Sequence, residues 1–396
     1  MSAYGIQNKW YTKHGDGRRA WARDGRKGVL RVRVGIDGRK LPGATGRGPV
    51  ENLRYAHSLG MEGVFFRTVL DMTPNLDPGL LKEVRACADD LGLYLESGLG
   101  KVNPYAMSET PELRAAGDGD TLLGFRRMIE ACAAVGITEL WTGTGNSKPY
   151  PGRFQYDRFR TDVEWADQLE AIAKFLGRLA PIARDHSVHI NLETHEEITS
   201  FEVVRLVEAA GPDAFGIVFD TSNLMQRGED PLRTAQRVAP YVRQTHIMDA
   251  ALSLSADGVL YQERTVGRGI VDFAQILPML DAANARLNLT IENAQAWDEV
   301  LLTYPTFSID LMPQRGMTVV EVFDPGWQSV HPDFSVQEMS AYLAVTHQCD
   351  ELIAVGRLDS FEAVTLDAFS HDDAVAAAQE SAAYLRHLLG VLGLRS

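Results

Sequence analysis

Eight short apolar runs recur along this chain, and amphipathic helical stretches separate most of them. The runs are rich in β-branched and aromatic residues and span residues 30–36, 62–67, 92–97, 137–142, 188–193, 215–220, 242–247 and 287–292. Strands that alternate with helices usually form a parallel sheet. Eight of them predict a closed (β/α)₈ barrel, the TIM-barrel architecture. An open doubly wound sheet usually has fewer strands and a glycine-rich phosphate turn after the first one, and the turn here, DGRKLPGATG, lacks that spacing.

Two segments exceed what such a barrel needs. Residues 1–28 are polar, basic and glycine-rich without a clear period, and we interpret them as an N-terminal extension to a TIM-barrel catalytic domain at 29–396. Residues 294–370 form a long insertion between the last strand and the last helix, where a barrel needs only a few residues. Barrel active sites form on this side of the strands. The insertion is therefore a candidate lid or subunit contact, and a packed decoration without a catalytic role is the alternative.

The composition argues against several classes of partner. The chain has 53 acidic and 39 basic side chains, a formal net charge of -14, whereas nucleic acids and anionic membranes are bound mainly by clustered Lys and Arg. Its three cysteines are widely spaced, so we expect neither a disulfide framework nor a cysteine zinc motif. The start, MSAYGIQNKW, lacks the apolar core of a signal peptide, and no apolar run approaches the ~20 residues of a membrane span. We expect a cytoplasmic protein.

Ionisable residues stand at the ends of the last four predicted strands. They are Glu193, Asp220, His246 and Glu292. Each alone is commonly a helix cap, an ion-pair partner or a hydrogen-bonded histidine, but parallel strands bring all four to one rim. Buried carboxylates that converge there would repel one another, and a divalent cation would resolve the conflict. Three carboxylates with one imidazole form a hard, mainly oxygen site, which favours Mn²⁺, with Mg²⁺ and Co²⁺ as alternatives, over a tetrahedral structural Zn²⁺.

Several segments carry a family resemblance. They are NLETHEEITSFEVVRLVEAAG, FGIVFDTSN, RGEDPLRTAQRVAPYVRQTHIMDA, TVGRGIVDFAQIL and LTIEN. They resemble the sugar phosphate isomerase/epimerase family, the xylose-isomerase-like TIM barrels, over about residues 30–296 and the ending ESAAYLRHLLG, most specifically from Asn191 to Asn293. The resemblance implies the same barrel and one divalent metal held by the four strand-end residues. Barrels of this group are often dimers or tetramers, so it also implies a homo-oligomer.

Two departures from the family bear on the substrate. Ketose 3-epimerases of this group carry a histidine three residues after the metal-binding Asp, where this chain has Asn223, and an arginine soon after the metal-binding His, which HIMDAALSL lacks. Both argue against a simple ketohexose epimerase. The chain also resembles the large subunit of C-glycoside deglycosidases, which cleave 3-oxo-glycosides and would need a small partner subunit. The aromatic loops WTGTGNSKPYPGRFQY and FDPGWQSVHPDF favour a substrate larger than a triose or pentose.

A metal beside a carboxylate base suits removal of a proton α to a carbonyl, which leaves an enediolate. Reprotonation then gives an isomer or epimer, whereas loss of a β-leaving group gives a lyase reaction. We favour a lyase that acts on a sugar or oxo-sugar, by dehydration or by 3-oxo-glycoside cleavage. A ketose or aldose isomerase or epimerase is the first alternative, and a non-catalytic sugar-binding subunit is the second.

The family also implies roles for individual residues. Its two metal-binding glutamates act as acid and base, which implies this role for Glu193 and Glu292. His195 lies two residues past Glu193, on the same face of a continued strand, and is a further acid–base candidate; a hydrogen-bonded loop histidine is the alternative. The candidate substrate contacts are Lys101, Trp141, Lys148 and Asn223.

Overall fold

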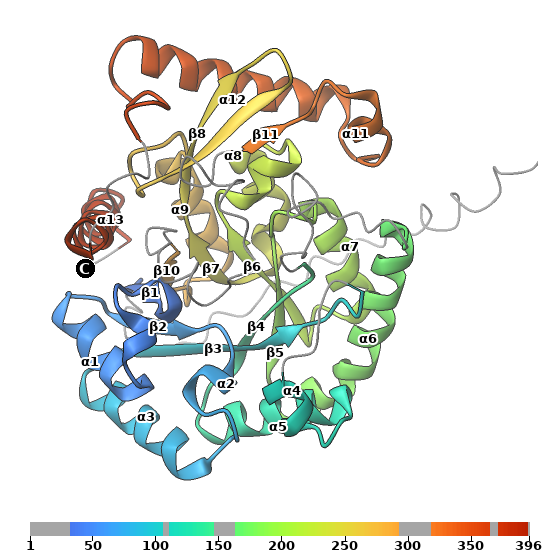
Figure 1. Ribbon diagram of the computed structural model, residues 1–396, viewed down its shortest axis with the longest axis vertical. Coiled ribbons are helices and arrows are strands. Elements are labelled where there is room, and N and C mark those ends of the chain that lie inside the picture. Colours follow the sequence, from blue (N-terminus) through green and yellow to red (C-terminus); the bar gives the residue numbers. More distant parts are fainter. Residues whose placement is uncertain (1–31, 106–110, 146–162, 293–317, 365–370, 395–396) are drawn as a thin grey trace, which may run out of the picture. The chain divides into compact units, whose positions relative to one another are not determined.

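The computed structural model describes residues 32–105, 111–145, 163–292, 318–364 and 371–394. Eight parallel strands close into a barrel in the order β1-β10-β7-β6-β5-β4-β3-β2, which confirms the predicted architecture (Figure 1). The strands are β1 (Val34–Asp37), β2 (Gly63–Phe66), β3 (Tyr94–Lys101), β4 (Glu139–Gly143), β5 (His189–Glu193), β6 (Phe215–Asp220), β7 (Val242–Ile247) and β10 (Leu289–Ile291). The barrel closes where Val34 of β1 pairs with Leu289 of β10.

Two strands extend past their predicted ends by segments that contain ionisable residues. The third strand, predicted to end at residue 97, continues to Lys101 with a register irregularity after Gly98. The first strand, predicted to end at residue 36, includes Asp37. Both extensions add ionisable residues to the carboxyl rim of the barrel, where the active sites of this architecture form.

Local sequence signals start the helices of the barrel. The side chains of Asp77, Asp120, Asp230 and Asp272 each accept a backbone N–H in the first turn of a helix, which satisfies a donor that would otherwise lack a partner. Thr199 caps the helix after β5 and forms a capping box with Glu202. The helices between β1 and β10 are α1 (Pro49–Ser58), α2 (Val69–Met72), α3 (Pro78–Asp90), α4 (Pro111–Ala116), α5 (Thr121–Ala134), α6 (Trp165–Asp185), α7 (Ser200–Ala210), α8 (Pro231–Val238) and α9 (Phe273–Ala283).

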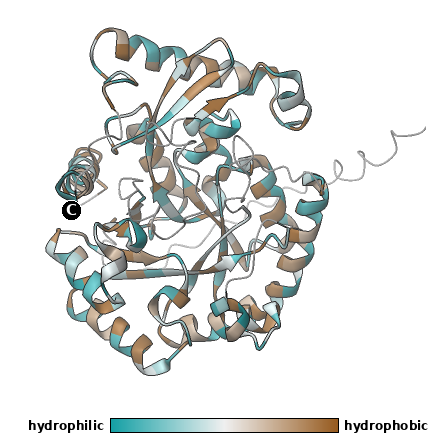
Figure 2. Ribbon diagram, in the orientation of Figure 1, coloured by the Kyte–Doolittle hydropathy of each residue, from teal (hydrophilic) through white to brown (hydrophobic). Residues whose placement is uncertain are grey.

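The long helices of the barrel bury apolar faces. In α3 the buried residues Leu81, Val84 and Ala88 follow the three- and four-residue spacing of one helical face, and hydrophilic and hydrophobic residues alternate along the helices (Figure 2). Helix α13 (His371–Val391) packs against β1 and β10 and buries Leu385 and Leu389. It therefore supplies the helix that follows the eighth strand. Among the helices described, none is long and apolar enough to cross a membrane.

A second, three-stranded antiparallel sheet was not predicted. The hairpin of β8 (Asp249–Leu254) and β9 (Val259–Arg264) directly follows β7, and β11 (Thr318–Val320) pairs with β9. Helix α12 (Val336–Ala354) packs on β8, where the hydroxyl of Ser253 donates to Asp350 over 2.6 Å. The described part of the 294–370 insertion, which includes β11, α11 (Pro325–Ser329) and α12, thus folds with a hairpin from another part of the chain. The predicted extension at 1–28 lies outside the described residues.

Candidate metal centre

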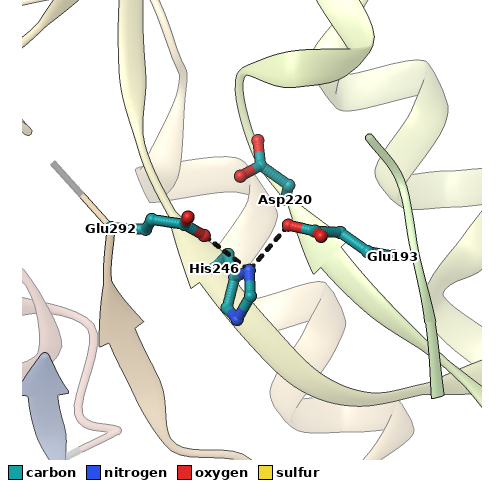
Figure 3. A group of neighbouring side chains, drawn as sticks. All are labelled: Glu193, Asp220, His246 and Glu292. Atoms are coloured by element: carbon teal, nitrogen blue, oxygen red, sulfur yellow. Dashed lines mark hydrogen bonds and ion pairs between the residues drawn. The ribbon is translucent and has the colours of Figure 1, made fainter. Parts of the chain in front are cut away.

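The four strand-end residues meet at one point. Glu193 ends β5, Asp220 ends β6, His246 is the penultimate residue of β7, and Glu292 follows β10. These strands are neighbours in the barrel, and Asp220 pairs directly with His246. One side-chain atom of each residue lies within 4.8 Å of those of the other three, and all four residues are buried. The sequence prediction that they share one rim is therefore confirmed as geometry (Figure 3).

The imidazole of His246 lies between two carboxylates. Its Nδ1 is 2.7 Å from Oε1 of Glu193 and 2.6 Å from Oε2 of Glu292 (Figure 3). Burial alone would lower the pKa of His246, but the negative charges of Glu292 and Glu193 outweigh it and raise the pKa well above its usual value. Burial would raise the pKa of Glu193, and the charges of His246 and His195 reverse this and lower it.

Asp220 has one carboxylate oxygen without a hydrogen-bond partner among the described residues. Its Oδ1 accepts the backbone N–H groups of Ser222 at 2.8 Å and Asn223 at 2.7 Å. Its Oδ2 is buried and accepts no hydrogen bond in the described part of the chain. Burial, followed by the charges of Glu193 and Glu292, raises the pKa of Asp220 well above its usual value. A buried carboxylate oxygen without a donor is costly, and a cation would satisfy it.

The donor set of this cluster fits a divalent cation. Three carboxylates and one imidazole offer oxygen and nitrogen ligands of the kind that Mg²⁺, Mn²⁺ and related ions accept. A cation there would partner the unused oxygen of Asp220 and offset the repulsion among the three carboxylates. The residues present therefore fit the predicted metal, although the geometry alone does not select Mn²⁺.

A second layer of side chains orients the cluster. The indole N–H of Trp141 donates to Oε2 of Glu193 over 2.9 Å. The guanidinium of Arg67, directly after β2, donates to Asp37 over 2.9 Å and to Oε1 of Glu292. Arg67 thus ties Glu292 to Asp37. Trp141 is 2% exposed, and its indole N–H holds the carboxylate of Glu193.

The other predicted residues lie at different distances from the centre. His195 is ion-paired with Glu196 at 2.7 Å and with Glu197, whose carboxylate also accepts the hydroxyl of Thr144 at 2.6 Å. Burial would lower the pKa of His195, but the charges of Glu196 and Glu197 raise it well above its usual value. Asn223 lies beside the cluster through its backbone N–H on Asp220.

Of the two lysines predicted to contact the substrate, only Lys101 lies among the described residues. The ammonium of Lys101 lies 4.9 Å from the ring centroid of Trp141, which places it next to the residue that binds Glu193. Lys148 lies outside the described residues.

Sequence reasoning did not anticipate Asp37 or Glu197. Asp37 directly follows the apolar run of the first strand, so the rule that found the four strand-end residues would also have found it. Glu197 belongs to a loop, and only the fold brings it to Thr144 and His195.

Glu96, in the middle of β3, lies away from this centre. Its Oε1 accepts the amide of Asn288 over 2.8 Å, and both residues border a polar cavity of about 380 Å³. The lining also includes Arg33, Thr138 and Arg243, which lie at or before the first residues of their strands. This cavity is therefore at the amino-terminal end of the barrel, opposite the metal centre.

Fold and site together define a class: a parallel (β/α)₈ barrel whose carboxyl rim carries a buried carboxylate–histidine cluster that could hold a metal. The comparisons with known proteins then give the family. The model of the xylose isomerase-like TIM barrel family matches residues 53–302, and the chain belongs to this family.

Curated relatives match parts of the chain. It is 28% identical over 177 residues to the uncharacterized protein YihM of Escherichia coli (43% of this chain, 52% of that protein). It is 25% identical over 147 residues to 3-oxo-isoapionate decarboxylase of Pectobacterium atrosepticum (37% of this chain, 53% of that protein). It is 34% identical over 92 residues to inosose dehydratase of Lacticaseibacillus casei (22% of this chain, 30% of that protein). The chain thus spans about half the length of the first two relatives and less of the third.

Solved structures agree on the fold. A D-psicose 3-epimerase from Clostridium cellulolyticum H10, crystallised with D-tagatose, superposes with a TM-score of 0.52 at 12% identity, covering 80% of this chain and 99% of that one. At this identity the likeness concerns the fold alone. By their names, the decarboxylase, the dehydratase and the epimerase are all enzymes that modify carbohydrates.

Proposed function

We propose that this protein is a divalent-metal-dependent enzyme that removes a proton α to a carbonyl of a sugar or oxo-sugar and completes a lyase reaction, such as a dehydration or the cleavage of a 3-oxo-glycoside. The observation that carries the proposal is the buried cluster at the carboxyl rim, with four ligand atoms within 4.8 Å of one another. The unused Oδ2 of Asp220 adds to it, because a purely structural cluster would gain by satisfying that atom.

Four residues would hold the metal: Glu193, Asp220, His246 and Glu292. A divalent cation bound there would polarise the carbonyl oxygen of a substrate and offset the negative charge of an enediolate. Mn²⁺ is the ion that we favour for this mainly oxygen site, with Mg²⁺ and Co²⁺ as alternatives.

The two glutamates are the proposed acid and base. Glu193 and Glu292 lie on either side of the imidazole of His246 (Figure 3), so they would face different sides of a substrate bound at the cluster. Trp141 and Arg67 hold their carboxylates in place through one hydrogen bond each. General acid–base catalysis needs this positioning within hydrogen-bond reach of the carbon-bound proton.

Further side chains would bind the substrate or move a second proton. We assign His195 to proton transfer at a leaving group, since it lies two residues from Glu193 and its imidazole is held by Glu197. Lys101 would bind an anionic or hydroxyl oxygen, and Asn223 would contact the substrate beside Asp220. We keep Lys148 as a predicted contact from the loop after β4.

Two observations support a lyase over an epimerase. The histidine and the arginine that are typical of the family's ketose 3-epimerases are missing, with Asn223 at the first position and no arginine in HIMDAALSL at the second. Two relatives with partial matches are named a decarboxylase and a dehydratase. Both are lyase reactions: a dehydration breaks the Cβ–O bond after the α-proton is removed, and a decarboxylation breaks the bond between Cα and the carboxyl carbon. A homo-oligomer, and for glycoside cleavage a small partner subunit, remain predictions.

The first test is the metal content of the purified chain, followed by turnover of metal-free and Mn²⁺-restored protein on ketoses, inososes and 3-oxo-glycosides. An unsaturated product or a released aglycone is the expected result. Solvent deuterium retained in a rearranged sugar would instead mean an isomerase or epimerase.

Variants complete the test. His246→Ala should abolish metal retention, while His347→Ala, whose side chain is 75% exposed on α12, should not change it. Absence of stoichiometric metal, together with absence of restored turnover, would overturn the proposed function.

A further inference from the structure

Charged side chains are segregated around the mouth of the barrel. The proposed metal ligands lie in or directly after β5, β6, β7 and β10. The opposite arc carries cations: Arg67 after β2, Lys101 at the end of β3, and Lys40 shortly after β1, whose charge acts on Glu292. Trp141 of β4 stands between the two arcs, with the guanidinium carbon of Arg67 at 5.4 Å and the ammonium of Lys101 at 4.9 Å from its ring centroid. The site is therefore not uniformly acidic.

Lys101 is a cation that no carboxylate of the described residues binds directly, although its charge acts on Glu197 beyond ion-pair distance. It is partly buried, and within the described residues its ammonium forms no hydrogen bond or ion pair. The nearby carboxylates already have other partners. Glu193 is bound by Trp141 and His246, and Glu197 is bound by Thr144 and His195. A partly desolvated ammonium without a hydrogen-bond acceptor among the described residues is an incomplete arrangement, because an ammonium has three donors to satisfy.

Arg67 differs from Lys101 in this respect. One of its terminal nitrogens is shared by Asp37 and Glu292. Its Nε is buried and has no hydrogen-bond partner in the part of the chain described. Arg67 is thus mainly an anchor for Glu292, and Lys101 is the group available to a ligand.

We propose that the substrate of this site is an anion, an oxo-sugar acid whose carboxylate is bound by Lys101 while its carbonyl and hydroxyl oxygens face the metal cluster. The proposal rests on the proposed function and names its substrate class. A carboxylate would complete the hydrogen bonding of the ammonium with charge-assisted bonds, which are stronger than those to a neutral hydroxyl. A neutral sugar would leave that charge unpaired.

The structure favours a carboxylate over a phosphate ester. A phosphate monoester carries nearly two charges and three acceptor oxygens, and it is commonly bound by several donors, such as a helix N-terminus or an arginine fork. Lys101 is a single point charge beside an aromatic ring. One ammonium matches the charge of one carboxylate.

The test is calorimetric titration of the full-length protein, loaded with Mn²⁺, with D-gluconate, D-glucitol and D-glucose 6-phosphate. Gluconate and glucitol have the same six-carbon chain and differ in the carboxylate. We expect gluconate to bind the wild-type protein about tenfold more tightly than glucitol. Lys101→Met should remove this preference, and Lys101→Arg should retain most of it. Lys82→Met, a change at an exposed lysine of α3, is the matched control and should leave the preference intact.

The outcomes separate this inference from the proposed function. A gluconate preference that survives in a folded Lys101→Met protein would place the carboxylate elsewhere and overturn the inference. Tighter Lys101-dependent binding of glucose 6-phosphate would overturn it in favour of a phosphate ester. If the chain retains no metal, the proposed function fails; the same titration of the metal-free protein then decides whether Lys101 still binds the anion.

Discussion

The Asp220→Asn substitution separates a metal centre from a structural carboxylate cluster. Oδ1 of Asp220 accepts two backbone N–H groups, and an asparagine oxygen in the same place keeps both bonds. The substitution replaces only Oδ2, the atom without a partner among the described residues, by an amide nitrogen. It also removes one negative charge beside Glu193 and Glu292, two of the groups that raise the pKa of Asp220. The metal-free variant should therefore be at least as stable as the metal-free wild type.

The effect of Asp220→Asn on stability should appear when metal is added. A ligand at one hundred times its Kd stabilises the folded state by about 2.7 kcal/mol. The compact unit from Arg31 to Ser396 should unfold with an entropy of about 0.8 kcal/mol per kelvin, from the average per-residue value. Saturating Mn²⁺ should thus raise the Tm of the wild type by about 3–4 °C. Asp220→Asn should lose most of this increase, because one anionic ligand becomes a neutral amide.

The assay is thermal unfolding of chelator-treated protein with and without Mn²⁺. Asp257→Asn, in the exposed turn between β8 and β9, is the matched control and should keep the full increase. An equal Tm increase in Asp220→Asn and in the wild type would refute the assignment of Asp220 as a ligand. A metal-free variant that is clearly less stable than the metal-free wild type would refute the argument that the carboxylates repel one another.

Two further predictions concern the surroundings of the centre. Tyr261→Phe removes the partner of the buried Ser222 hydroxyl, 2.7 Å away, and should cost about 1–2 kcal/mol of unfolding free energy in urea; an unchanged midpoint would contradict it. Burial, only partly offset by Arg237 and Ser200, raises the pKa of Glu229 from 4.5 to about 7. The folded state therefore holds a proton that the unfolded state releases between these pH values, and stability falls as pH rises through this window. Glu229→Gln should reduce the loss of unfolding free energy between pH 5 and pH 8 by about 3 kcal/mol, measured by urea unfolding. An equal loss in the variant and the wild type would refute this prediction.

The barrel could be predicted because its information is local. Every barrel strand lies mostly buried, so each appears in the sequence as an apolar run. The second sheet could not be predicted in the same way. Only Met248 separates β7 from β8, so the two strands read as one segment, and β11 joins β9 from more than fifty residues further along the chain. That pairing is a tertiary contact with no local signal.

The same distinction between local and tertiary information applies to the candidate site. The four strand-end residues could be predicted, since parallel strands of a barrel bring their carboxyl ends to one rim. The partners of those residues could not. Arg67 reaches Glu292 across 225 positions of sequence, and Trp141 reaches Glu193 across 52. Such contacts depend on side-chain length and rotamer inside the closed barrel, which an apolar pattern does not encode.

The arrangement of charge at the rim connects the missing epimerase arginine with the substrate proposed here. Ketose 3-epimerases of this family place an arginine soon after the metal-binding histidine, on the acidic arc, and this chain has none in HIMDAALSL. Two of its rim cations, Arg67 and Lys101, lie after β2 and on β3, across the barrel mouth from β6 and β7. A substrate held from that side would span the mouth, with its carboxylate at Lys101 and its reacting carbons at the cluster. The substrate proposed here would therefore be held by cations of this arc, and its binding there requires no change in the residues that would remove the proton.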